Sequence, residues 1–205
     1  MGITITKNMT QTQSSVADFM RLYDQEVNTV PTVPSGDVRA MRVNSLAEEV
    51  GELAMASGMS LVLTASPGMT KPVVKVMHVR DFTSLEDIAD ALVDCQYFID
   101  GTACAYGLDL EPLFNEVHSS NMRKLWTLED LNHMQVDWAA KAVSVVDNQD
   151  GTYAPPPIQE DGNHPVRKVV RFIVKRPDGK VMKPPGYKPA DLSHQIKLQS
   201  GEDRT

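Results

Sequence analysis

The stretch Leu46-Ala47-Glu48-Glu49-Val50-Gly51-Glu52-Leu53-Ala54 carries the pattern that decides the fold of this chain. Its three glutamates are three and four residues apart, so they share one side of a helix. The apolar residues of the stretch draw another side, and they continue a helical period that begins near Val38. We therefore predict a helix over about residues 37–57, with Gly58 just beyond its end, where glycine is common.

A second acidic helix is predicted over residues 85–106, where Thr83 or Ser84 can cap the first turn and Gly107 follows the end. Asp90 and Asp94 are four residues apart on it, amid residues that are apolar nearly all round. Such a pattern is typical of a helix enclosed by others. Like charges at this spacing repel, and unpaired buried carboxylates are costly.

A hard divalent cation would relieve both costs, and ligand sets made only of oxygen favour Mg²⁺ or Mn²⁺ over zinc. The predicted metal ligands are Glu48, Glu49, Glu52, Asp90 and Asp94. The alternative is that these acids are solvated helix faces. Histidine-based sites fit less well, because Glu116 and His118 lack the Glu-x-x-His spacing of di-iron bundles, and there is no GxxxxGK[ST] phosphate loop.

The rest of the chain predicts a mainly α fold. Further helices are expected over about residues 16–27 and 109–125, and the segment 59–82 reads as a small β-hairpin or ordered loop inserted between helices. After Trp126 the helical signals weaken. Residues 169–174 and 180–182 flank a Pro-Asp-Gly turn and predict a hairpin, which an extended strap over residues 183–189 follows.

Composition narrows the function classes. The net charge of −7 argues against binding a nucleic-acid polymer, which needs clustered basic residues. Neither a membrane-spanning run nor a signal peptide is visible, so we expect a cytoplasmic protein with no membrane partner, in the host cytoplasm if it is viral. Cys95 and Cys104 have no Cys/His partners nearby and are read as small buried apolar residues.

Three motifs together resemble a known family. Glu48-Glu49-Val50-Gly51-Glu52, the Asp90/Asp94 pair and Ser119-Ser120-Asn121-Met122-Arg123-Lys124 resemble the all-alpha NTP pyrophosphohydrolases, the MazG-like group that includes phosphoribosyl-ATP pyrophosphohydrolase. That group carries EExxE on one helix and ExxD on the next. Aligning Asp94 with the Asp of ExxD puts Ala91 at the Glu position, with Asp90 beside it. Asp87-Ile88-Ala89-Asp90 is a rival alignment.

The resemblance implies a four-helix MazG-like core over residues 16–126, with the hairpin as an insertion. Residues 1–15 would be a flexible N-terminus, 127–175 an insertion of unknown role, and 176–205 a C-terminal hairpin or extended strap with a loose tail. The strap resembles that of bacteriophage members. A subsidiary guess is a dGTP-hydrolysing MazG-like enzyme of phages that replace adenine by 2-aminoadenine.

The activity implied is metal-dependent hydrolysis of a nucleoside or deoxynucleoside triphosphate, with dGTP or GTP as candidate substrates, to the monophosphate and pyrophosphate. Glu48 and Glu49 would serve catalysis as well as metal binding. The substrate-binding residues would be Asn121, Lys124, Arg42, Lys183 and Tyr187. The family builds its sites at subunit interfaces, so a homodimer or homotetramer is expected. Two alternatives stay open: a phosphoribosyl-ATP pyrophosphohydrolase, and a catalytically silent nucleotide-binding protein of the same fold.

Overall fold

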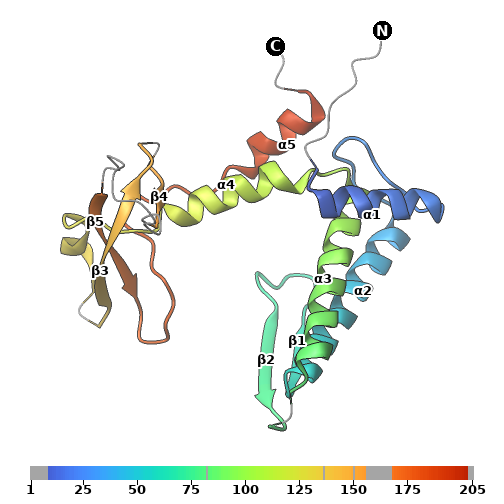
Figure 1. The fold of residues 1–205 in the computed structure, drawn as a ribbon, viewed down its shortest axis with the longest axis horizontal. Helices are drawn as coiled ribbons and strands as arrows, with labels where there is room; N and C mark the ends of the chain where they lie inside the picture. Colours follow the sequence, from blue (N-terminus) through green and yellow to red (C-terminus); the bar gives the residue numbers. More distant parts are fainter. Residues whose placement is uncertain (1–8, 82, 136, 150, 156–167, 203–205) are drawn as a thin grey trace, which may run out of the picture. The chain divides into compact units, whose positions relative to one another are not determined.

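The computed structural model describes residues 9–81, 83–135, 137–149, 151–155 and 168–202 (Figure 1). The chain divides into two compact units, residues 1–111 with 196–205, and residues 112–195. The elements, in chain order, are α1 (Gln11–Leu22), α2 (Gly36–Ala56), β1 (Met59–Thr64), β2 (Val73–His78), α3 (Leu85–Tyr106), α4 (Leu110–Met122), the 3-10 helix η1 (Asp130–His133), β3 (Ala139–Asp147), β4 (Tyr153–Ala154), β5 (Lys168–Lys175) and α5 (Leu192–Ser200).

The prediction of a mainly α fold with a four-helix core is wrong. The described residues form five α-helices and two small antiparallel sheets, which makes the fold mixed α and β. The difference lies mainly in residues 127–175, where β3 pairs with β5 along eight residues and β4 adds a short third strand. The tail also departs from expectation, because residues 192–200 form α5. Among the described residues, no helix is both long enough and apolar enough to cross a membrane.

Helices α2 and α3 form the body of the first unit and lie side by side (Figure 1). Each begins at a serine whose side chain accepts a hydrogen bond from a backbone N–H of the first turn: Ser35 from Val38, and Ser84 from Asp87. Such caps satisfy donors that a helix start leaves without intrahelical partners. The sequence placed α3 over the observed range and α2 within one residue at each end.

Helix α1 supplies most of the buried core of the first unit. It begins at Gln11 and not near Val16, because Thr10 caps it and Gln13 is buried. A cluster of buried side chains joins α1 to α3: Val16, Ala17, Met20, Cys104 and Ala105. Cys104 is thus the small buried residue that was predicted, whereas Cys95 is only partly buried.

The end of α3 is held by polar groups from elsewhere in the first unit. The amide of the fully buried Gln13 donates to the Leu108 carbonyl at 2.6 Å and accepts from the Leu110 N–H at 3.1 Å. Asn28 donates from its side chain to the Ala105 carbonyl at 2.6 Å. Gly107 closes the helix in the left-handed conformation (φ 68°). Asn28 thus satisfies a carbonyl that the helix end leaves open, and Gln13 holds the short connection from α3 to α4.

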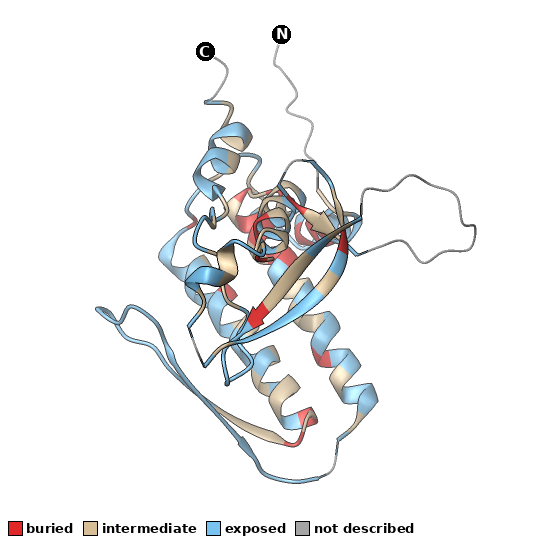
Figure 2. Cartoon of the chain, turned by 90° about the vertical axis from the view of Figure 1, so that its left-hand side faces the viewer, coloured by how far each residue is buried: buried red, intermediate tan, exposed pale blue. Residues whose placement is uncertain are grey.

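The predicted insertion hairpin is present as β1 and β2, which pair antiparallel from Met59–His78 to Thr64–Val73. All of β2 is exposed, and so is the outer half of β1 (Figure 2). The hairpin is attached at its base, where the N–H groups of Val79 and Arg80 both donate to the Gly58 carbonyl. Its length and exposure make it dependent on this attachment, since an isolated two-stranded hairpin is marginally stable.

The second unit is built around Trp126, which is almost completely buried. Its backbone exchanges two hydrogen bonds with Phe172 of β5, and its indole N–H donates to the Met182 carbonyl at 3.0 Å. The strap is fastened to α4 within this unit: the Tyr187 hydroxyl lies 2.5 Å from that of Ser120. The predicted Pro-Asp-Gly turn is present, but β5 pairs along its length with β3, and its contact with residues 180–182 is confined to a single bridge at Val181.

Gly107 provides a test of how α3 ends. A Cβ at this position would lie 2.0 Å from the Val30 carbonyl oxygen. Gly107→Ala should therefore lower the free energy of unfolding by clearly more than the roughly 1–2 kcal/mol that a left-handed conformation alone costs a non-glycine residue. Chemical denaturation measures the difference. Gly68→Ala is the matched control, because Gly68 also has positive φ (90°) but open space around it. Equal losses in the two variants would contradict the close approach of Val30.

Candidate metal and phosphate site

The acids of α2 and α3 act on one another electrostatically. The pKa of Glu49 is raised above its ordinary value by partial loss of solvent and by the negative charges of four other acids: Glu52, Asp94, Glu48 and Asp90. These are the residues predicted as metal ligands. The pKa of the Cys95 thiol is raised by its burial and by the charges of Glu49 and Asp94. Glu49 is thus the centre of a patch of negative charge on the paired helices.

This patch fits a hard divalent cation in its donor chemistry. All five side chains offer carboxylate oxygens, which Mg²⁺ and Mn²⁺ prefer. The five acids lie on regular helices, and the sulfur on which two of them, Glu49 and Asp94, act electrostatically is the partly buried thiol of Cys95. Within the described part of the chain, no group of three or more acidic, histidine or cysteine side chains is gathered closely enough to hold an ion as it stands. Coordination would require the exposed carboxylates to rotate towards a common centre.

On the second acidic helix, Asp90 and Asp94 are open to solvent, and residue 91 is not. Ala91 is buried, with only 3% of its surface exposed, whereas Asp90 is exposed and Asp94 partly exposed. Both aspartates contribute to the raised pKa of Glu49. Asp87, the rival ligand, lines a small hollow together with Glu52 and Asp90. An acid at position 91 would point into the packing of the helices.

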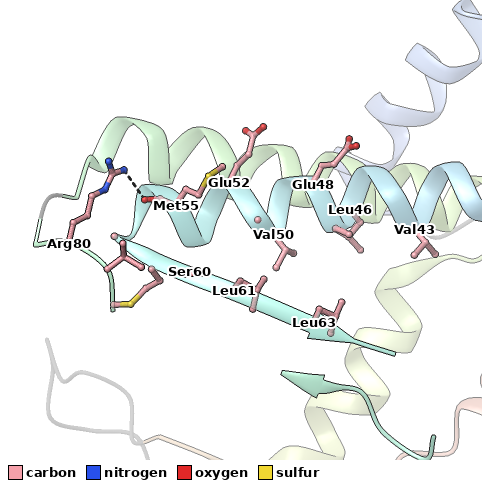
Figure 3. Close-up of a pocket in the computed structure, with 15 residues that line it drawn as sticks. Val43, Leu46, Glu48, Val50, Glu52, Met55, Ser60, Leu61, Leu63 and Arg80 are labelled. Carbon is pink, nitrogen blue, oxygen red and sulfur yellow. Dashed lines mark hydrogen bonds between the residues drawn. The ribbon is translucent and has the colours of Figure 1, made fainter. Parts of the chain in front are cut away.

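Two hollows flank the end of α2. The larger is a groove of about 1010 Å³ between α2 and the hairpin, with a mainly apolar lining. In Figure 3, Val43, Leu46 and Val50 point towards β1, whereas Glu48 and Glu52 point away from it. The smaller hollow, of about 260 Å³, is lined by Glu52, Met55, Ala56, Arg80, Asp87 and Asp90. Helix α2 therefore separates an apolar side from an acidic side.

Arg42, which the sequence suggested as a phosphate-binding residue, is buried among the helices. Only 6% of its surface is exposed, and its guanidinium donates to Gln25 at 3.0 Å and contacts the Met20 sulfur at 3.5 Å. A Cβ at Gly101 would lie 2.9 Å from the guanidinium, so the glycine leaves room for it. Burial lowers the pKa of Arg42. The residue belongs to the packing of the helices, and this placement gives no support to contact with a substrate.

The other predicted substrate-binding residues belong to the second unit. The Lys124 ammonium donates to the Asn121 side-chain oxygen at 2.7 Å, so these two share a face as their spacing indicated. Lys183 lies over the ring of Tyr187, 4.5 Å from its centre, and Tyr187 contacts Ser120 of α4. The four residues therefore form two close pairs, and both pairs belong to the second unit. Their contact with a nucleotide stays a prediction.

Sequence reasoning missed Arg80. It lines both the apolar groove and the acidic hollow, and one guanidinium nitrogen donates to the Met55 carbonyl at 3.1 Å (Figure 3). The residue follows a short strand and precedes the cap of α3, in a segment read as a simple connection. The available signal was a single arginine between the two acid-bearing helices, which is weak without a structure.

The raised pKa of Glu49 gives a test of the patch in metal-free protein. A carboxylate whose folded pKa is raised stabilises the fold below its unfolded pKa, and this contribution is lost as the pH rises through the folded pKa. After treatment with a chelator, Glu49→Gln should therefore melt at a higher temperature than the unaltered chain at pH 7. The difference should shrink as the pH falls below 4. Asp18→Asn, at an exposed acid of α1, is the control. A lower melting temperature for Glu49→Gln at pH 7 would contradict this electrostatic picture.

Comparison with known proteins identifies a family for this chain. Residues 16–121, a little over half of the chain, match the family model described as phosphoribosyl-ATP pyrophosphohydrolase. The matched range contains all five acids and ends at Asn121. A search of curated proteins gave no match. The chain belongs to the phosphoribosyl-ATP pyrophosphohydrolase family, within the MazG-like superfamily.

Proposed function

We propose that this protein hydrolyses a nucleoside or deoxynucleoside triphosphate between the α and β phosphates, with Mg²⁺ or Mn²⁺ held by Glu48, Glu49, Glu52, Asp90 and Asp94. The observation that carries the proposal is the placement of these five acids on the paired helices α2 and α3, within the range that matches the family model. Family membership supports pyrophosphohydrolase chemistry in general. The acid patch supplies a place for it on α2 and α3.

The chain's own residues account for the steps. A divalent ion bound there would neutralise phosphate charge and lower the pKa of a water molecule. Glu49, or Glu48 beside it, accepts the proton of the attacking water. The oxygen of that water bonds to the α-phosphorus as the bond from this phosphorus to the bridging oxygen breaks, which yields a monophosphate and pyrophosphate.

A second candidate substrate is phosphoribosyl-ATP, because the matched family model bears that name. It carries the same triphosphate, so the acid patch could serve either reaction. Among ordinary nucleotides, dGTP and GTP come first, from the resemblance to dGTP-hydrolysing MazG-like enzymes of phages. A catalytically silent nucleotide-binding protein is the remaining alternative.

A substrate screen tests the activity. The protein is incubated with Mg²⁺ or Mn²⁺ and each NTP, each dNTP or phosphoribosyl-ATP, and the release of pyrophosphate is followed. We expect pyrophosphate and the monophosphate from at least one substrate. Glu49→Ala and Asp94→Ala should each lower the rate by at least about a hundredfold, the lower range for loss of a positioned catalytic group.

The control for this screen is Glu86→Ala, which removes an exposed acid from the first turn of α3, outside the patch. It should keep the parent rate. Release of inorganic phosphate would contradict cleavage between the α and β phosphates. Absence of any release, in protein shown by calorimetry to bind Mn²⁺, would favour the silent nucleotide-binding alternative.

We also propose that the protein works as a homo-oligomer, a homodimer or homotetramer. The support is the amount of apolar surface that the first unit leaves uncovered. Leu92, Val93 and Ile99 of α3 are 45–64% exposed, and Val50 and Met55 of α2 are also exposed. Apolar side chains that gather on a surface mark association sites, and Leu92 and Val93 are adjacent on α3. The composition of α3 suggested a helix enclosed by others, but its own chain leaves these residues exposed. In this proposal a second copy of the chain covers them.

Removing this apolar surface should weaken association. The double variant Leu92→Ser and Val93→Ser should shift the protein towards the mass of a single chain in light scattering after size exclusion. Leu22→Ser on α1 is the control, since Leu22 is more exposed (79%) but lies on another helix. A single-chain mass for the unaltered protein over a wide concentration range would contradict the oligomer.

A further inference from the structure

The acidic hollow contains one cation whose position is fixed by the fold. Two hydrogen bonds help to position Arg80. Its backbone N–H donates to the Gly58 carbonyl at 3.2 Å, and its guanidinium donates to the Met55 carbonyl at 3.1 Å. Both acceptors lie at the C-terminal end of α2, which is the negative end of the helix dipole. The helix dipole and the hydrogen bond to the Met55 carbonyl are sufficient to stabilise an arginine at this position.

The surroundings of the guanidinium go beyond helix capping. Arg80 lines the same hollow of about 260 Å³ as Glu52, Asp87 and Asp90. Two of these acids belong to the patch that acts on Glu49. An arginine that only caps a helix does not require carboxylates beside it. A phosphate that binds both a metal ion and a guanidinium requires metal-binding carboxylates and a guanidinium close together. The lining of this hollow includes both carboxylates and a guanidinium.

We infer that Arg80 binds the polyphosphate of the substrate, at the junction between the hairpin and the acid patch. This inference rests on the proposed function for its physiological ligand. A guanidinium presents a planar set of N–H donors that matches phosphate oxygens, and its charge persists at every relevant pH. Metal held by the acids and Arg80 would neutralise the polyphosphate from two sides. The insertion hairpin thus contributes a binding residue, and not only a connection between α2 and α3.

The location of Arg80 also indicates how a nucleotide would be oriented. Arg80, Glu52 and Met55 are shared by the acidic hollow and the apolar groove. With its phosphates at Arg80 and the acids, a substrate extends its remaining, less polar part along the groove between α2 and β1. Arg80 therefore marks the border between the charged and apolar subsites.

The test uses inorganic tripolyphosphate as a probe, so that it does not depend on catalysis. Calorimetric titration in the presence of Mg²⁺ should give a dissociation constant at least about tenfold weaker for Arg80→Gln than for the parent, as expected for a lost charge-assisted contact. Arg80→Lys should recover part of the affinity, because it restores the charge without the planar donor set. Lys75→Gln is the matched control: it removes a positive charge from the same exposed hairpin, at a position outside both hollows.

Kinetics with the best substrate from the screen separates binding from folding. Arg80→Gln should raise KM more than it lowers kcat, and circular dichroism should show an unchanged helix content. Equal affinity for tripolyphosphate in parent and Arg80→Gln would overturn this inference. In that case the proposed hydrolysis would still stand if Glu49→Ala had lost turnover. If no substrate is hydrolysed, the proposed hydrolysis fails, and the tripolyphosphate titration still decides whether Arg80 binds phosphate.

Discussion

The packing of α2 against α3 brings like charges together, and the rest of the first unit is arranged around that cost. Partial loss of solvent raises the pKa of Glu49, and the negative charges of the other four acids across the helix pair add to it. The opposing attraction comes from the other end of α3, where α1 contributes a buried core, Asn28 satisfies a carbonyl of the helix terminus and Gln13 holds the connection to α4. Stability and charge are thus concentrated at different ends of the same helix.

Local rules predicted the helices well because their signals lie within a few residues. Ser84 and Gly107 bound α3 in sequence as they do in space. Two short β-branched runs separated by Pro67-Gly68 predicted a hairpin or an ordered loop, and the structure has the hairpin. The sheet of the second unit was missed for the opposite reason. Residues 139–147 begin with Ala-Ala-Lys-Ala, which does not favour a strand, and their partner β5 lies more than twenty residues away. Pairing at that separation leaves no local pattern.

The candidate site divides in the same way. Helical spacing identified the acids of α2 and α3, because three- and four-residue intervals fix the side of a helix. Spacing did not reveal that Arg42 is buried, because its position on α2 says nothing about burial and a glycine on a neighbouring helix makes room for it. Helical spacing could not identify Arg80, because this residue reaches the end of α2 only through the return of the hairpin to Gly58.

The exposure of the hairpin has a consequence for local stability. Its strands are paired with each other and exposed over most of their length, so their amides gain little protection from the core. Opening of the hairpin would therefore cost far less than unfolding of the helices. Since its base also carries Arg80, a fluctuation that frees the hairpin would withdraw a positive charge from the acid patch without disturbing the acids. Hydrogen exchange in β1 and β2 would then report how tightly the site is assembled.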